Sequence, residues 1–265
     1  MSLAADMFRT LAFTLTVFIG TAAFGSVAMI AGVLGVPNRH SGIYDKVAHG
    51  WSRLILWVAG TKVAVYGLEN IPKNQPVVFV SNHQSWFDIW ILAGNLPGQV
   101  RFVAKKELGR IPILGRAMRS AGHIIIDRQN RQAALAAYEE ASATINSGMS
   151  AVVFAEGTRS RTGELLPFKK GPFVLAIAAQ VPVVPVYCAG TFELLPKGSL
   201  RVRPKPVAVV VGKPMSTLNL RYEDRDRFMA DVRLVIERLR EDGLNLLGEL
   251  VDGGEAAGGN GGAEQ

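Results

Sequence analysis

Residues 78–88 read VFVSNHQSWFD, and this stretch predicts the class of fold. The apolar run at its start does not alternate with polar residues, which is the pattern of a strand buried on both faces of a sheet. The polar turn that follows leads into a segment of helical pattern near 86–95. A strand that passes directly into a helix is typical of α/β domains, in which ligands bind beyond the carboxyl ends of the strands.

Strand-like and helix-like segments alternate along the rest of the chain. Val- and Ile-rich runs such as HIIID and AVVFA again lack strict alternation. The pattern predicts an α/β fold with a mostly parallel central sheet flanked by helices. The expected strands lie near 62–67, 76–81, 100–104, 123–127, 150–155, 182–188 and 206–211, and the expected helices near 86–95, 113–121, 130–147, 170–180 and 221–241.

An uncharged apolar segment of 26 residues, 11–36, precedes this domain. As a helix it would be about 39 Å long, which is enough to cross a bilayer. The apolar core of a cleaved signal peptide is usually shorter, and a hairpin lying in the membrane interface is another alternative. The segment therefore predicts an N-terminal membrane-associated helical segment but leaves its topology open.

The stretch 44–60 has apolar side chains at helical spacing, carries Trp51 and Trp57, and ends at Gly60. It predicts a second helix that either belongs to the core or rests at a membrane interface. The Gly-rich C-terminal end has the composition of a disordered segment. The expected division is membrane-associated helices at 1–60, a catalytic domain at 61–251 and a disordered tail at 252–265.

The chain is basic, with 29 Lys and Arg residues against 22 Asp and Glu and a net charge of +7. Such a charge suits nucleic acid, anionic membranes or phosphorylated substrates. The sequence has no zinc-finger spacing, RNA-binding aromatic signature or long basic run, so we expect no nucleic-acid partner. The bases after the apolar segment predict a catalytic domain on the cytoplasmic side of the membrane, the inner membrane if the protein is bacterial. Cys188 is the only cysteine, and its apolar neighbours indicate a buried small residue.

His83 and Asp88 are the first candidates for catalysis. An imidazole at the end of a strand can act as a general base near neutral pH. It acts best when a carboxylate holds its other nitrogen in one tautomer, which Asp88 can do across a turn. Ser85 and Asp88 also have the spacing of a helix-capping box, so the acid has a structural interpretation as well. The two roles are compatible.

A second polar loop, FAEGTRSRTGE at 154–164, also follows an apolar strand. Glycine lets a backbone approach a ligand, and arginine suits bidentate binding of phosphate. Two further strands deliver cations at their ends, Lys105 and Arg128. Each stretch alone also fits an exposed polar loop or a surface ion pair. Together they predict transfer to a hydroxyl group on a phosphorylated, membrane-resident substrate.

Several common sites are excluded by their missing motifs. The sequence has neither the glycine-rich dinucleotide fingerprint nor a P-loop, and it has no G-x-S-x-G nucleophile elbow. The four histidines show no paired metal-binding spacing, so we expect no metal site.

In this order, the motifs resemble those of the 1-acyl-sn-glycerol-3-phosphate acyltransferase family. The resemblance covers roughly residues 60–215. One departure is Ala155, which stands where a proline usually precedes E-G-T-R; the change removes no polar group. The matching blocks are N-H-x-x-x-x-D at 82–88, KKELGRIPILG at 105–115, GHIIIDR at 122–128, FAEGTRS at 154–160 and VPVVPV at 181–186.

The resemblance implies that an acyl thioester, either acyl-CoA or acyl-carrier protein, acylates the sn-2 hydroxyl of lysophosphatidic acid to give phosphatidic acid. The expected partners are these two substrates and membrane lipids, with no cofactor. His83 is the implied base and Asp88 the acid that orients it. Glu156 is implied to fix the loop or its arginine. The implied substrate-binding residues are Lys105, Arg128, Glu156, Gly157, Thr158 and Arg159.

Other interpretations stay open from the sequence. The same chemistry can act on another lysolipid, such as a lyso-ornithine lipid. A non-catalytic protein that binds membrane surfaces is an alternative of a different class, although it would not need His83 and Asp88. Thioester hydrolysis is disfavoured because the chain offers no evident nucleophile.

Overall fold

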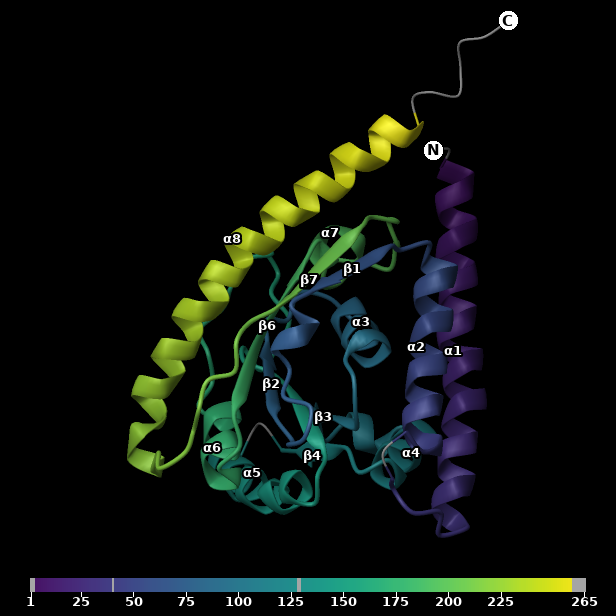
Figure 1. The fold of residues 1–265 in the computed structure, drawn as a ribbon. Coiled ribbons are helices and arrows are strands. Elements are labelled where there is room, and N and C mark those ends of the chain that lie inside the picture. The colour runs from purple at the N-terminus through teal and green to yellow at the C-terminus, as the bar shows by residue number, and fades with distance from the viewer. Residues whose placement is uncertain (1–2, 40, 128–129, 259–265) are drawn as a thin grey trace, which may run out of the picture.

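The computed structural model describes the chain except for residues 1–2, 40, 128–129 and 259–265. Its centre is a seven-stranded sheet of order β1-β7-β6-β2-β5-β3-β4 (Figure 1). Every neighbouring pair is parallel except β6 and β7, so the predicted mostly parallel sheet is confirmed. The strands are β1 (Val63–Tyr66), β2 (Val78–Ser81), β3 (Val100–Lys105), β4 (Ile124–Ile126), β5 (Ser150–Phe154), β6 (Val183–Ala189) and β7 (Val207–Val211).

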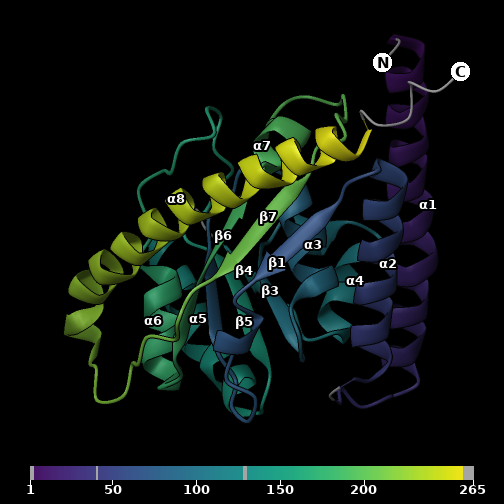
Figure 2. The same ribbon diagram turned by 45° about the horizontal axis from the view of Figure 1, so that its top comes forward.

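Helices cover both faces of the sheet (Figures 1 and 2). One core joins a face of the strands to α5, α6 and α8, and the other joins the opposite face to α1, α2 and α3. Strands β2, β5 and β6 are buried on both faces, as their continuous apolar runs predict. The helices are α1 (Leu3–Val33), α2 (Ile43–Ala59), α3 (Phe87–Asn95), α4 (Leu114–Ser120), α5 (Arg131–Asn146), α6 (Gly171–Ala179), α7 (Thr191–Leu194) and α8 (Arg225–Gly258).

Helices α1 and α2 lie side by side along one side of the α/β domain (Figures 1 and 2). Helix α1 also packs against α4, where a Cβ on Gly32 would lie 2.1 Å from the Ser120 hydroxyl oxygen. Phe13 of α1 stacks on Phe87 of α3 with 5.2 Å between ring centroids. The outer side of α1 is apolar and exposed, and Phe18 is 72% exposed there. The N-terminal helices are therefore joined to the domain along one side and bare along the other.

A buried ion pair joins α2 to the sheet. Arg101 of β3 donates to Asp45 at 2.9 Å and to Asn38, in the segment between α1 and α2, at 2.5 Å. Both charged side chains are almost fully buried. Because a buried charge is costly without its partner, this cluster fixes the position of the helix pair on the domain.

The C-terminal end differs from its prediction. Helix α8 begins at Arg225 after a short 3-10 turn and continues to Gly258, well past the expected end near 241. Leu246, Leu247 and Leu250 lie at helical spacing and pack against the core, so they prolong the helix. Residues 252–258 of the expected disordered tail are helical, and the rest of that tail lies outside the described residues.

Candidate active site

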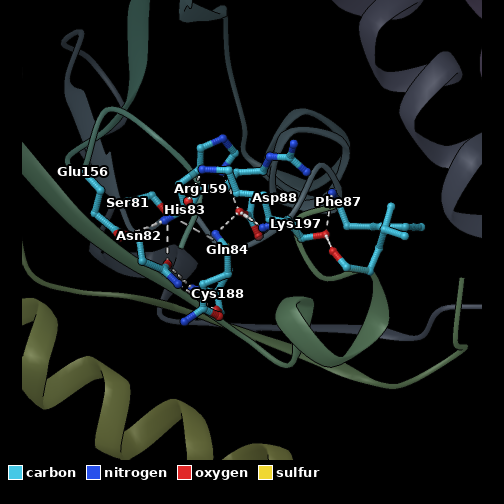
Figure 3. A network of polar contacts seen from close by, with 12 residues as sticks. Ser81, Asn82, His83, Gln84, Phe87, Asp88, Glu156, Arg159, Cys188 and Lys197 are labelled. Atoms are coloured by element: carbon cyan, nitrogen blue, oxygen red, sulfur yellow. Dashed lines mark hydrogen bonds and ion pairs between the residues drawn. The ribbon is translucent and has the colours of Figure 1, made fainter. Parts of the chain in front are cut away.

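His83 and Asp88 meet at the carboxyl end of β2, the middle strand of the sheet (Figure 3). His83 Nδ1 lies 2.7 Å from Asp88 Oδ2. The Asp88 carboxylate is fully buried, whereas the His83 side chain is 11% exposed. Because the carboxylate can only accept, Nδ1 carries the ring proton and Nε2 is the basic nitrogen of the neutral imidazole.

One carboxylate oxygen of Asp88, Oδ2, accepts the hydrogen bond from His83 and two backbone hydrogen bonds. The backbone donors are the N–H of Gln84 at 2.7 Å and that of Ser85 at 2.8 Å. The bond to Ser85 is the one that the capping-box spacing predicts. Oδ1 is buried and has no hydrogen-bond partner among the described residues. The orienting and the local structural contacts of Asp88 therefore share a single atom.

The loop after β5 holds the backbone of His83 from both sides. The Glu156 carboxylate accepts the His83 N–H at 2.7 Å, and the Ser160 N–H donates to the His83 carbonyl at 2.8 Å. The second oxygen of Glu156 accepts the N–H of Leu166 at 2.9 Å. The imidazole itself stacks on Phe154, with 3.8 Å between ring centroids. These contacts define the position of the ring relative to the E-G-T-R loop.

Glu156 has a strongly perturbed environment. Burial raises its pKa to about 7, and the negative charge of Asp88 adds to this, while the two backbone N–H donors and Arg233 oppose it. A carboxyl group with such a pKa contacts the backbone of the candidate base. Of the two implied roles for Glu156, the geometry favours fixing the loop over fixing the arginine.

Asn82 joins the site to the neighbouring strand. Its side-chain oxygen accepts the Cys188 N–H at 2.8 Å, and its amide donates to the Cys188 carbonyl at 3.0 Å. Asn82 thereby extends the pairing of β2 with β6 by one residue. Cys188 is fully buried and burial raises its pKa well above the usual value, so the thiol is neutral, as its apolar sequence neighbours predict.

Arg159 lies beside the His83–Asp88 pair (Figure 3). Its guanidinium carbon is 4.6 Å from the centroid of the Trp86 ring, which is a cation–π contact. Partial burial lowers its pKa from the usual value, and the charge of Asp88 acts in the opposite direction. Gly157 has a φ of 69°, a backbone conformation that glycine adopts without strain. Thr158 is exposed at the tip of the same loop.

The other two predicted cations are placed differently. Lys105 ends β3 with an exposed side chain, at the same edge of the sheet but two strands away from β2. Arg128 lies outside the described residues. Among the described residues, no group of three His, Cys, Asp or Glu side chains could hold a metal ion.

The motifs do not specify two residues near the site: Gln84 occupies a variable position of N-H-x-x-x-x-D, and Lys197 lies outside all of the matching blocks. The Gln84 amide donates to the Gly163 carbonyl at 2.5 Å, which joins the loop of His83 to the loop after β5. Lys197, in the loop after α7, donates to Thr158 and to the Arg159 carbonyl. The signal available for Lys197 was positional, because strand 182–188 is also predicted to end at this edge of the sheet.

Known proteins resemble this chain in both sequence and fold. Residues 62–189 match the family described as Acyltransferase. A 1-acyl-sn-glycerol-3-phosphate acyltransferase from Cocos nucifera is 34% identical over 77% of this chain and 65% of its own length, so the chain spans less than two thirds of that relative. The human 1-acyl-sn-glycerol-3-phosphate acyltransferase alpha is 34% identical over 77% of this chain and 70% of its own length.

A solved structure is similar over nearly its whole length. The crystal structure of the 1-acyl-sn-glycerophosphate (LPA) acyltransferase PlsC from Thermotoga maritima matches 91% of this chain and 98% of that chain, with a TM-score of 0.76 and 27% identity. The chain belongs to the 1-acyl-sn-glycerol-3-phosphate acyltransferase family, as its ordered motifs predicted.

Proposed function

We propose that this chain transfers an acyl group from an acyl thioester to the sn-2 hydroxyl of lysophosphatidic acid and forms phosphatidic acid. The observation that carries the proposal is the buried His83–Asp88 pair at the end of β2 beside the cationic loop of Arg159. The relatives named for 1-acyl-sn-glycerol-3-phosphate, and the PlsC structure named for lysophosphatidic acid, support this acceptor.

The arrangement supports direct transfer without a covalent enzyme intermediate. Nε2 of His83 takes the proton of the acceptor hydroxyl while the oxygen attacks the thioester carbonyl carbon. The Asp88 carboxylate stabilises the imidazolium that forms. The C–S bond then breaks, and the imidazolium returns the proton to the departing thiolate. The products are the ester and a free thiol, and His83 is neutral again.

The charge near His83 favours a phosphorylated acceptor. Arg159 presents a planar cation that suits the oxygens of a phosphate group. A lyso-ornithine lipid has no phosphate; its single carboxylate is accompanied by an ammonium group, so its headgroup carries no net negative charge for the arginine to bind. Acyl-CoA and acyl-carrier protein both supply the thioester, and no resident cofactor is needed for the reaction.

We also propose that α1 holds the enzyme at the membrane on the cytoplasmic side. Met7–Val33 is long and apolar enough to cross a bilayer by length and composition. Its contacts with α2 and α4 cover one side, so lipid cannot surround it evenly. We therefore expect the exposed side, which includes Phe8 and Phe18, to face lipid while the other side stays on the domain. Fractionation of cells expressing the full chain should recover it with membranes; recovery in the soluble fraction would contradict this.

The function is tested by an acylation assay on the purified, detergent-solubilised chain. Labelled lysophosphatidic acid is offered with acyl-CoA or acyl-carrier donors, and a lyso-ornithine lipid is the competing acceptor. The His83→Ala variant should lose about 10²–10⁴ in kcat, the usual contribution of a general base, and keep its thermal unfolding midpoint. If the wild-type chain acylates only the lyso-ornithine lipid, lysophosphatidic acid is not its acceptor and the proposed function is wrong. A His83→Ala variant with near-normal turnover would contradict the mechanism.

A further inference from the structure

Lys197 reaches the E-G-T-R loop from a distant part of the sequence. Its Nζ lies 3.0 Å from the hydroxyl oxygen of Thr158 and 3.0 Å from the carbonyl oxygen of Arg159, 38 residues away (Figure 3). An ammonium group has three donors, and these contacts use two of them. The side chain is half-buried. Lys197 therefore places a second positive charge against the backbone of the loop that carries Arg159.

The loop of Lys197 is hydrogen-bonded to the loop that carries His83 and Asp88. The Ser85 hydroxyl donates to the Leu195 carbonyl at 2.8 Å, two residues before Lys197. Ser85 also donates its backbone N–H to Asp88. The position of the ammonium is thus tied to the same short segment that orients His83.

Neither cation forms an ion pair with a carboxylate of the described residues, although the buried charge of Asp88 acts on Arg159 from a longer distance. No Asp or Glu among the described residues forms an ion pair with Lys197 or Arg159 within 4.0 Å. By contrast, Lys170 and Arg240 elsewhere on the surface each pair with a carboxylate. Two cationic side chains that meet at one loop and have no ion-pair partner within 4.0 Å favour a bound anion.

The number of charges indicates which anion fits. A phosphate monoester carries about −1.5 to −2 charges at pH 7 and has three acceptor oxygens. Two cations match that charge, and the planar guanidinium and the point-like ammonium offer donors from different directions. A carboxylate would balance only one of them.

We propose that Lys197 binds the phosphate group of the acceptor together with Arg159. The proposal rests on the proposed function and adds to it a substrate-binding residue outside the sequence motifs. Acyl-CoA and the carrier-protein prosthetic group also contain phosphate. The KM for lysophosphatidic acid reports on the acceptor phosphate, and the KM for the thioester reports on the donor phosphate, so the two sources can be distinguished.

The first test uses Lys197→Gln, with Lys205→Gln as the matched control. Lys205 lies in the same basic loop, is exposed and has no hydrogen bond to a described residue. Lys197→Gln should raise KM for lysophosphatidic acid by about 10–100-fold, the factor expected when a charge-assisted hydrogen bond is lost, and leave KM for the donor unchanged. Lys197→Arg should restore part of the affinity, and Lys205→Gln should behave like the wild type. An unchanged acceptor KM, a loss in kcat alone, or an effect on the donor alone would overturn the proposal.

A binding measurement separates this proposal from the proposed function. Titration calorimetry of sn-glycerol 3-phosphate against the full solubilised chain does not depend on turnover. Weaker binding to Lys197→Gln than to the wild type supports the proposal even if lysophosphatidic acid is not acylated. Equal binding to both proteins, or no binding to the wild type, overturns it. Failure of wild-type turnover with lysophosphatidic acid would instead contradict the proposed function.

Discussion

Among the described residues, two buried pairs join a carboxylate to a nitrogen base, and they differ in what the base can do. Asp45 and Arg101 lie near the amino end of β3, whereas Asp88 and His83 lie beyond the carboxyl end of β2. In both pairs a backbone N–H supports the carboxylate, from Ser41 in the first and from Gln84 in the second. Burial and ion pairing alone therefore do not distinguish an active site from a structural clamp.

The two pairs differ in their nitrogen base, which is arginine in one and histidine in the other. Arginine stays protonated in proteins, and Arg101 is closed off from solvent with 2% exposure. The imidazole of His83 gains and loses a proton near neutral pH and keeps an exposed edge. The first pair can only fix α2 and the preceding segment on the sheet, while the second can carry a proton to and from a substrate.

The largest expected effect on stability is at the structural pair. Arg101→Met leaves the Asp45 carboxylate buried without its partner, so the free energy of unfolding should fall by about 3–5 kcal/mol. Lys170→Met is the control, because Lys170 forms an exposed ion pair with Asp226 and should cost no more than about 1 kcal/mol. Denaturant unfolding in detergent measures both. A loss for Arg101→Met no larger than that of the control would show that the pair is not a clamp.

A smaller effect is expected at Glu156, which supports the catalytic pair without belonging to it. Glutamine keeps only one of the two acceptors, so either the N–H of His83 or that of Leu166 loses its partner. Glu156→Gln should lower kcat about 10-fold and leave KM for lysophosphatidic acid nearly unchanged. The exposed Glu69→Gln is the control. A raised KM with normal kcat would assign Glu156 to substrate binding instead.

The pH dependence of stability gives a second measure for the same Glu156→Gln variant. The folded pKa of about 7 lies above the unfolded value of 4.5, so the folded chain binds the proton more tightly. The stabilising contribution of protonated Glu156 is therefore complete below about pH 4.5 and is lost as pH rises to about 7. Relative to the wild type, Glu156→Gln should gain on the order of 3 kcal/mol of unfolding free energy across this interval. Parallel pH profiles for the two proteins would contradict this assignment of the pKa.

Much of this account follows from sequence, for physical reasons that differ between residues. His83 and Asp88 are five residues apart on one loop, so local spacing allowed them to pair, and the accompanying motifs favoured that pairing over a helix cap alone. The parallel sheet followed from apolar runs without alternation, because such runs can only be buried on both faces. The contact of Glu156 with the His83 backbone depends on β2 and β5 being neighbours, which the sequence does not state.

The missed features depend on tertiary packing. Lys197 stands in an unremarkable turn, LLPKGSL, and becomes a candidate only when the loop after α7 folds onto the loop after β5. The antiparallel direction of β7 has no signal in its buried run VAVVV. Helix α8 is longer than predicted because Leu246, Leu247 and Leu250 pack against the core, a contact that the local sequence does not show.

The central claim is that Asp88 holds His83 as the general base, and turnover of Asp88→Asn tests it most directly. Two backbone N–H donors require an acceptor at the Oδ2 position, so the amide oxygen should take that place and still accept from Nδ1. The ring tautomer is then kept, and only the charge that stabilises the imidazolium is lost. We predict a kcat about 10–100-fold below the wild type, a smaller loss than for His83→Ala. The amide NH2 then takes the buried position of Oδ1, which has no partner among the described residues, so the free energy of unfolding should fall by about 1–3 kcal/mol. Turnover of Asp88→Asn within twofold of the wild type would contradict the claim and leave Asp88 as a helix cap.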